Sequence, residues 1–149
     1  MKVTAISLDI AWEDKQLNFA KVESLVSQME GKGDLIVLPE MFSTGFTMNL
    51  SLAEDAAGET LKWMIATAAK YNVAIMGSFP FTQNGREVFN RAYFVKPDGT
   101  WSHYDKRHLF RMGDENSHYT SGDEITIVEY KGVKFALKIC YDIRFPVWR

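Results

Sequence analysis

The stretch Val133-Lys-Phe-Ala-Leu-Lys-Ile-Cys140 ends on the only cysteine of the chain and continues into Tyr141-Asp-Ile-Arg-Phe-Pro146. Its apolar residues recur at every second position, as in a strand that is buried on one side. Cys140 falls on the opposite face, with Lys134 and Lys138, just before a polar turn. The neighbouring ammonium groups predict a lowered thiol pKa and hence a reactive cysteine. The alternative is a buried and inert cysteine, because alternation is least regular at a strand end.

The elements that precede this stretch predict a mixed α/β fold. Strands are expected at Lys2–Leu8 and Asp34–Leu38, each followed by an amphipathic helix, over Asp14–Glu30 and Glu59–Tyr71. In the first helix, the residues expected to face the core are Leu17, Ala20, Leu25 and Met29. Five more strands follow as a meander with hairpin turns: Val73–Phe79, Val88–Val95, Thr100–Tyr104, Ile125–Tyr130 and Val133–Cys140. This order predicts a mixed sheet with helices on at least one side.

The composition is that of an ordinary globular chain. Of its 149 residues 46% are hydrophobic and 24% are charged, and the net charge is −2, so no basic surface for nucleic acid is expected. The opening Met1–Asp9 is too short and too interrupted for a signal-peptide core, and no stretch approaches a membrane span. A single cysteine cannot form an internal disulfide. These features together predict a soluble, cytoplasmic protein without nucleic-acid or membrane partners.

Two further segments place polar side chains directly after predicted strands. Glu40 follows the apolar run Leu35–Leu38, and the cluster Tyr104-Asp-Lys-Arg-His-Leu-Phe110 follows a meander strand. Taken singly, each segment is more typical of a solvated surface. Together with Cys140 they offer a base, a cation and a thiol, which are the groups that a cysteine hydrolase needs. No metal or cofactor is predicted, because three histidines without ligand spacing are expected in loops: His103, His108 and His118.

Three motifs occur in a fixed order along the chain: Leu38-Pro-Glu-Met-Phe42, Tyr104–Phe110 and Lys138-Ile-Cys-Tyr-Asp-Ile-Arg-Phe-Pro146. In this combination the sequence closely resembles the carbon–nitrogen hydrolase (nitrilase) superfamily and its Glu-Lys-Cys triad. The resemblance spans all 149 residues. The stretch His103–Glu115 is most similar to bacterial omega-amidases, which hydrolyse the side-chain amide of 2-oxoglutaramate and related ω-amides of dicarboxylic acids. A small-molecule amide is therefore the expected substrate.

The resemblance implies a role for each matching residue. Cys140 would be the nucleophile and Glu40 the general base. Lys106 would stabilise the tetrahedral oxyanion, together with the backbone N–H of Tyr141. The residue types suit this chemistry, because thiolate attack on an amide carbon develops negative charge on oxygen.

The family also has a second, structural glutamate shortly before a Gly-Asp turn. Glu115 is the best match in this chain, and Glu124 is the alternative. A substrate of omega-amidase type would carry a carboxylate distant from its amide, and nearby guanidinium groups can bind it in bidentate fashion. The candidates are Arg111 and Arg144. We favour Arg111, because Arg144 belongs to a motif shared beyond this branch and is more typical of a structural ion pair.

The family fold is an α-β-β-α sandwich that typically dimerises. Family domains run to roughly 250–300 residues, above the common domain size. Residues 1–149 would therefore be the N-terminal part of one such domain, ending where a helix after Pro146 is expected, and the sandwich would be incomplete at the C-terminus. Two alternatives stay open. One is another branch, such as a carbamoyl-amine hydrolase or a nitrilase, and the other is a non-catalytic fragment that acts as a binding or assembly module.

Overall fold

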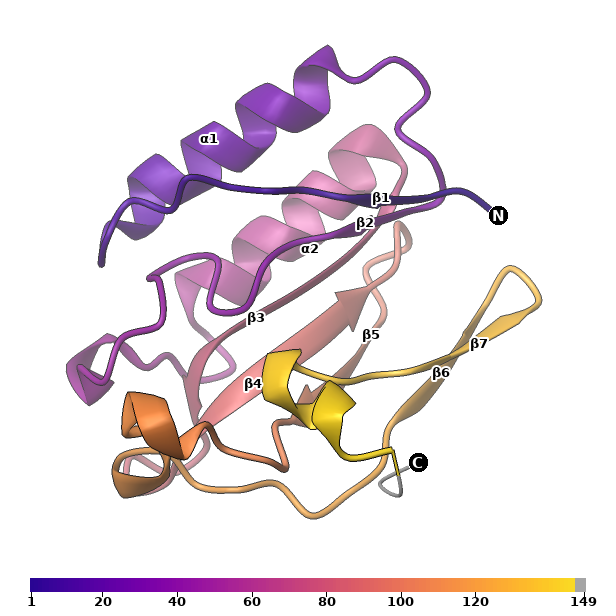
Figure 1. The fold of residues 1–149 in the computed structure, drawn as a ribbon. Coiled ribbons are helices and arrows are strands. Elements are labelled where there is room, and N and C mark those ends of the chain that lie inside the picture. The colour runs from indigo at the N-terminus through magenta and orange to yellow at the C-terminus, as the bar shows by residue number, and fades with distance from the viewer. Residues whose placement is uncertain (147–149) are drawn as a thin grey trace.

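The central sheet combines parallel and antiparallel strands (Figure 1). The computed structural model describes residues 1–146, so the helix expected after Pro146 lies outside the described residues. Five strands lie in the order β1-β2-β3-β4-β5, of which the first three are parallel and the last two are each antiparallel to their neighbours. Their bounds are Val3–Ala5, Leu35–Val37, Ala74–Thr82, Val88–Val95 and Trp101–Asp105.

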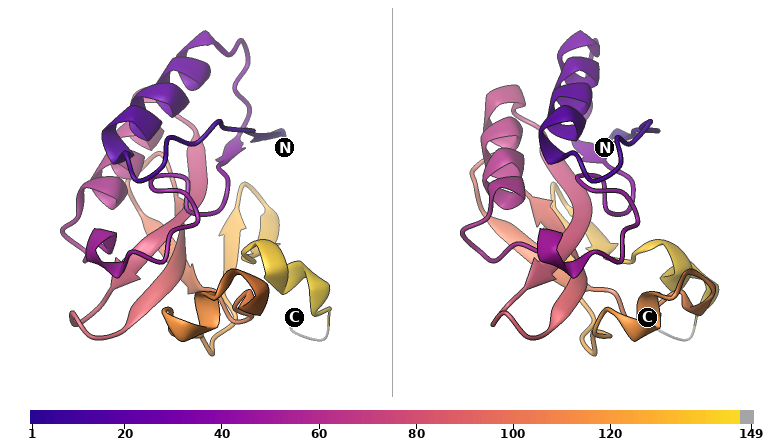
Figure 2. Two further views of the ribbon diagram at one scale, coloured as in Figure 1. Left: turned by 60° about the vertical axis from the view of Figure 1, so that its left-hand side comes forward. Right: turned by 90° about the vertical axis from the view of Figure 1, so that its left-hand side faces the viewer.

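Helices cover one face of this sheet and a hairpin lies on the other (Figure 2). Parallel neighbours need a crossover connection, and here these connections are α1 (Lys15–Gln28) and α2 (Glu59–Tyr71). The hairpin is a separate two-stranded sheet of β6 (Ile127–Tyr130) and β7 (Val133–Ala136). Four short 3₁₀-helices complete the described elements: η1 (Leu50–Leu52), η2 (Arg111–Gly113), η3 (Glu115–Ser117) and η4 (Cys140–Arg144).

Each face of the sheet has its own apolar core. On the helix side, α1 and α2 bury their apolar stripes against β2, β3 and β4 through residues such as Val22, Met64 and Phe79. On the other side, Leu137 and Ile139 pack against Phe94 of β4. The segment that leads to Cys140 is therefore anchored in the second core, even though it is no longer a strand at that point.

The rotation of α1 differs from the predicted one. Leu17 and Leu25, predicted to face the core, are 46% and 39% exposed, and the buried apolar stripe consists instead of Phe19, Val22 and Val26. A buried polar side chain fixes this rotation. Asn18 accepts a hydrogen bond from the N–H of Ala11 and donates to the carbonyl oxygens of Ala11 and Ser43. Since both stripes have helical spacing, the sequence period alone could not choose between them.

Most other predicted elements are confirmed with shifted ends. The bounds of α2 and β4 agree with the prediction, whereas the strand expected at Lys2–Leu8 is paired only over three residues. The strand expected to run to Cys140 ends at Ala136. Alternation nevertheless continues, since Leu137 and Ile139 are buried and Cys140 is exposed. Cys140 itself begins η4 in the left-handed region, with φ of 42°, which a strand does not allow.

The sheet topology sets where the loops meet. β3 is parallel to β2, and β5 is parallel to β3 because each is antiparallel to β4. The carboxyl ends of β2 and β5 therefore lie at the same edge of the sheet. Glu40 follows β2 and Lys106 follows β5, so the topology brings these two residues to one edge, 66 positions apart in sequence.

Candidate active site

The loop after β2 is held against β3. The N–H of Leu38 donates to the carbonyl of Met76, and the N–H of Met41 donates to the hydroxyl of Ser78 at 2.9 Å. Met41 adopts a left-handed conformation, with φ of 49°, which turns the chain directly after Glu40. The carboxylate of Glu40 therefore comes from a loop fixed on a buried strand.

The loop after β5 is held by a glycine that admits no side chain. The N–H of Gly122 donates to the carbonyl of Lys106 at 2.9 Å, and a Cβ at Gly122 would overlap the carbonyl oxygen of Asp105. The N–H of Lys106 donates in turn to the carbonyl of Asn90 in β4. The Gly-Asp turn of the sequence motif thus packs directly against the backbone that carries the lysine.

Lys106 is the centre of a buried charge network. Its side chain is completely enclosed, and its ammonium lies 2.7 Å from Glu40 Oε1 and 2.8 Å from Glu115 Oε2. Asn90 Nδ2 donates to both carboxylates, at 2.8 and 3.0 Å, and the N–H of Phe110 donates to Glu115 Oε2. Burial disfavours the ammonium, but the charges and hydrogen bonds of Glu40 and Glu115 outweigh it and raise the pKa of Lys106. Lys106 is thus a cationic donor, not a base.

The two glutamates occupy different environments. The side chain of Glu115 is fully buried and both of its oxygens accept hydrogen bonds, so it serves to fix Lys106. Glu40 is 18% exposed and also faces Cys140. Glu124, the alternative to Glu115, is exposed and lines a different cavity. The structure therefore places Glu115, and not Glu124, beside the predicted triad.

Cys140 lies beside these charged groups, but its pKa is shifted in the direction opposite to the predicted one. Partial burial, the charge of Glu40 and a hydrogen bond to Glu40 raise the pKa of the thiol, and Lys106 lowers it only in part. The expectation of a lowered pKa was wrong because burial of the sulfur and the charge of Glu40 outweigh the effect of Lys106, and the lysines of the preceding segment do not contribute. The resting site thus places a thiol and a carboxylate in the wall of one cavity, the arrangement in which an adjacent base activates the nucleophile.

A cavity of about 730 Å³ opens at this thiol. Its lining is mainly apolar and consists of Glu40, Phe46, Phe110, Met112, Gly113, Cys140, Tyr141, Ile143 and Arg144. Arg144 lines this cavity, whereas Arg111 lines a neighbouring one of about 520 Å³ between the Lys106 loop and η4. The first cavity is large enough for a small molecule, and the guanidinium of Arg144 in its lining can pair with an anionic group.

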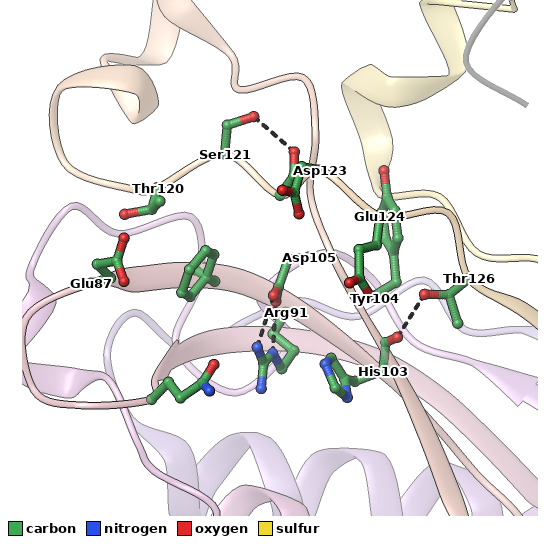
Figure 3. Close-up of a pocket in the computed structure, with 13 residues that line it drawn as sticks. Glu87, Arg91, His103, Tyr104, Asp105, Thr120, Ser121, Asp123, Glu124 and Thr126 are labelled. Carbon is green, nitrogen blue, oxygen red and sulfur yellow. Dashed lines mark hydrogen bonds and ion pairs between the residues drawn. The ribbon is translucent and has the colours of Figure 1, made fainter.

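A third cavity, of about 330 Å³ and lined mainly by polar residues, lies against β4 and β5 (Figure 3). Its floor is the bidentate pair of Arg91 and Asp105, with nitrogen–oxygen distances of 2.7 and 2.8 Å. Arg91 also stacks over the ring of Phe81, 4.0 Å from its centroid. Arg91 is therefore engaged in structural contacts, and this cavity lacks the chain's only cysteine.

Sequence reasoning missed Asn90 and misplaced one histidine. Asn90 is fully buried. The only sign of it in the sequence is a polar residue within the apolar run of β4. His103, expected in a loop, lies in β5, while His108 and His118 do lie in loops or turns.

A family model described as "Carbon-nitrogen hydrolase" matches residues 2–148 of the 149-residue chain. This chain belongs to the carbon–nitrogen hydrolase family. The omega-amidase YafV of Escherichia coli strain K12 is 40% identical over 148 residues, which are 99% of this chain and 57% of that protein. The 2-oxoglutaramate amidase of Bacillus subtilis is 32% identical over 149 residues, covering 98% of this chain and 58% of the relative. This chain thus spans a little over half the length of these relatives.

A solved structure agrees with the fold. A carbon–nitrogen hydrolase superfamily protein from Xanthomonas campestris, with an arsenic adduct in its active site, superposes with a TM-score of 0.92. The two sequences are 38% identical, and the match covers 97% of this chain and 55% of the Xanthomonas campestris chain. The predicted superfamily and mixed α/β fold are confirmed. Within residues 1–146, no helix is long and apolar enough to cross a membrane.

The raised pKa of Cys140 generates a testable pH dependence. Glu40→Gln removes a negative charge and should lower that pKa, so the pH midpoint for alkylation of the thiol by iodoacetamide should move to lower pH. Alkylation at neutral pH should then be faster than in the wild-type protein, because only the thiolate reacts. Mass spectrometry of the Cys140 peptide over a pH series measures the rate.

Glu124→Gln is the matched control for this experiment, since Glu124 is exposed and lines the other cavity. It should leave the midpoint unchanged. An upward shift, or no shift, in Glu40→Gln would mean that Glu40 does not act on the sulfur.

Proposed function

We propose that this carbon–nitrogen hydrolase is a cysteine-dependent omega-amidase. Its substrates would be 2-oxoglutaramate and similar ω-amides of dicarboxylic acids, hydrolysed to the acid and ammonia. The observation that carries the proposal is that the Cys140 thiol and Glu40 line one cavity, and that the carboxylate of Glu40 shares the enclosed Lys106 ammonium with Glu115. The omega-amidase and 2-oxoglutaramate amidase named above support the substrate class.

The first half of the reaction forms a thioester. Glu40 takes the thiol proton as Cys140 Sγ attacks the amide carbon, and the resulting oxyanion is stabilised by the Lys106 ammonium and the N–H of Tyr141. Glu40 then returns the proton to the amide nitrogen as the C–N bond breaks and ammonia leaves. The carbonyl carbon is now bonded to the sulfur of Cys140.

The second half releases the acid. A water molecule gives a proton to Glu40 while its oxygen attacks the thioester carbon, and the same two donors stabilise the second oxyanion. The C–S bond breaks and the proton passes from Glu40 to the sulfur, which restores the thiol. One amide and one water have become one acid and one ammonia. The raised pKa of Cys140 suits both steps, because sulfur and carboxylate exchange one proton in each.

The buried partners of Lys106 explain why it can act in both halves. Its ammonium is already desolvated, and Glu115 keeps it charged and in place, so no water needs to reorganise when the oxyanion forms. In a dry pocket such a charge acts more strongly than it does in water.

Two alternatives to an omega-amidase can be separated by assay. A carbamoyl-amine hydrolase or a nitrilase would act through the same Cys140, and assays with the corresponding substrates separate these branches from an omega-amidase. A non-catalytic binding or assembly module would show no turnover at all. Since residues 1–149 span 57% of the Escherichia coli relative, activity is best assayed in the natural gene product. A cytoplasmic location and a dimer stay predictions.

The direct test of the proposed function is Cys140→Ser. We expect ammonia release from 2-oxoglutaramate to fall by about 10²-fold or more, because a hydroxyl beside Glu40 is a poorer nucleophile than a thiol. Thermal unfolding should stay close to that of the wild type, since the side chain is exposed. Retention of more than about a tenth of the wild-type kcat would exclude Cys140 as the nucleophile.

A second experiment concerns the distal carboxylate. Because Arg144 lines the cavity of Cys140 and Arg111 lines its neighbour, the geometry now favours Arg144 as the carboxylate partner. Arg144→Ala should raise KM for 2-oxoglutaramate about tenfold or more, as loss of a charge-assisted pair does, and leave an uncharged amide unaffected. Arg111→Ala is the matched variant and should change KM less. Equal losses on both substrates would indicate a structural role for Arg144.

A further inference from the structure

A third buried carboxylate lies next to the site and takes no part in the chemistry described above. Asp142 is 1% exposed, two residues after the nucleophile. Its Oδ1 accepts from the N–H of His108 at 2.8 Å and lies 2.9 Å from His108 Nδ1. Its Oδ2 accepts from the hydroxyl of Tyr104 at 2.8 Å and from the N–H of Ile139 at 3.1 Å. Both carboxylate oxygens are therefore bonded twice.

These four contacts join two separate segments. Tyr104 in β5 and His108 in the loop after it flank Lys106, whereas Ile139 and Asp142 flank the nucleophile in the turn of η4. A second contact reinforces the same junction, since the rings of His108 and Phe145 are stacked with centroids 3.8 Å apart. The oxyanion lysine and the nucleophile are thus held together by one buried carboxylate between their loops.

The same carboxylate shapes the turn that presents the sulfur. The N–H of Asp142 donates to the carbonyl of Ile139, and its side chain accepts from the N–H of Ile139, so the two residues cap each other across Cys140 and Tyr141. Cys140 sits between them at a φ of 42°, a conformation that a residue with a side chain adopts only at a cost. Reciprocal capping supplies the bonds that maintain it.

We propose that Asp142 is a positioning residue that sets the distance between the nucleophile turn and the Lys106 loop. Its carboxylate orients Cys140 Sγ and the N–H of Tyr141 relative to the Lys106 ammonium without touching the substrate. This inference rests on the proposed amide hydrolysis for its kinetic consequence, but the junction itself can be tested separately.

Both oxygens of Asp142 are needed as acceptors, so the shape of the side chain alone is not enough. Two of the donors are backbone N–H groups, one at each carboxylate oxygen, and they cannot become acceptors. An asparagine must place its NH₂ group at one of these two positions, where it would face a donor. Asp142→Asn should therefore release either His108 or Ile139 from the junction while conserving the volume of the side chain.

The test compares two reactions of the same sulfur in the natural gene product. Hydrolysis of 2-oxoglutaramate needs Lys106 and the Tyr141 N–H at the oxyanion, whereas alkylation by iodoacetamide needs only an accessible thiolate. In Asp142→Asn, kcat should fall about 10²-fold with KM nearly unchanged, as misplacement near 1 Å does. Alkylation at the same pH should fall far less, because the thiol stays accessible and Asp142 is not among the groups that shift the pKa of Cys140.

Asp114→Asn is the matched control. Asp114 also lies near a histidine nitrogen, with its Oδ2 3.5 Å from His118 Nδ1, but its side chain is 67% exposed. This variant should leave both reactions unchanged. Amide hydrogen exchange supplies a readout that does not depend on activity. In Asp142→Asn, protection should fall in both 106–110 and 139–145, and should persist in the β6–β7 hairpin.

The outcomes are distinct. Loss of hydrolysis with alkylation retained and faster exchange in both loops supports a positioning role. Retained hydrolysis, an equal loss of both reactions, or faster exchange in only one loop overturns it. A wild-type protein that alkylates at Cys140 but hydrolyses no amide would overturn the proposed function, and the exchange experiment alone would then decide whether Asp142 joins the two loops.

Discussion

The Lys106 ammonium is enclosed completely, and most of the site follows from what that enclosure requires. An unpaired buried cation is costly, so Lys106 must have carboxylates at hydrogen-bond distance, and it has Glu40 at 2.7 Å and Glu115 at 2.8 Å. Removing one partner of such a pair typically costs about 3–5 kcal/mol. Two carboxylates around one ammonium leave a negative charge in excess, and this excess lies beside the Cys140 sulfur. Partial burial of the sulfur and this excess charge both raise the pKa of the thiol, so its proton is held in the resting site.

The sheet makes this arrangement possible because parallel β2 and β5 end at one edge. Each loop that leaves this edge is tied to the neighbouring strand, through Ser78 in one case and Asn90 in the other. The nucleophile comes from outside this sheet, after the β6–β7 hairpin, and is attached to the core through Leu137 and Ile139. Three segments, each attached to a different part of the fold, thus meet at the site. The contacts of Asp142 link two of them, the segment of Cys140 and the loop of Lys106.

Local patterns predicted much of the fold. Helix α2 and strand β4 have strong and unambiguous periods, and their bounds agree with the prediction. Helix α1 was found, but its rotation was not, because a buried Asn18 fixes it through contacts with distant backbone that no local pattern contains. The end of β7 was missed for a similar reason. Cys140 lies on the expected side of the chain, yet it has a left-handed φ within a turn that the side chain of Asp142 caps.

The sequence predicted which residues form the site better than it predicted their electrostatics. The motifs identified Glu40, Lys106 and Cys140, and the structure brings them together with Glu115. The predicted direction of the Cys140 pKa shift was wrong. That direction depends on the burial of the sulfur and on the charges around it in space, which the sequence does not show. Asn90 was missed because a single amide in an apolar strand shows no sequence signal of its partners, Glu40 and Glu115.

The central claim is that Glu40 handles the proton of the Cys140 thiol during attack on the amide. Rapid-quench mass spectrometry of the Cys140 peptide, with 2-oxoglutaramate in excess, tests it most directly. The account predicts that the wild-type protein forms an acyl adduct on Cys140 within a turnover. It also predicts that Glu40→Gln forms none, because no group is left to protonate the departing ammonia. Rapid, stoichiometric acylation of Cys140 in Glu40→Gln would contradict it.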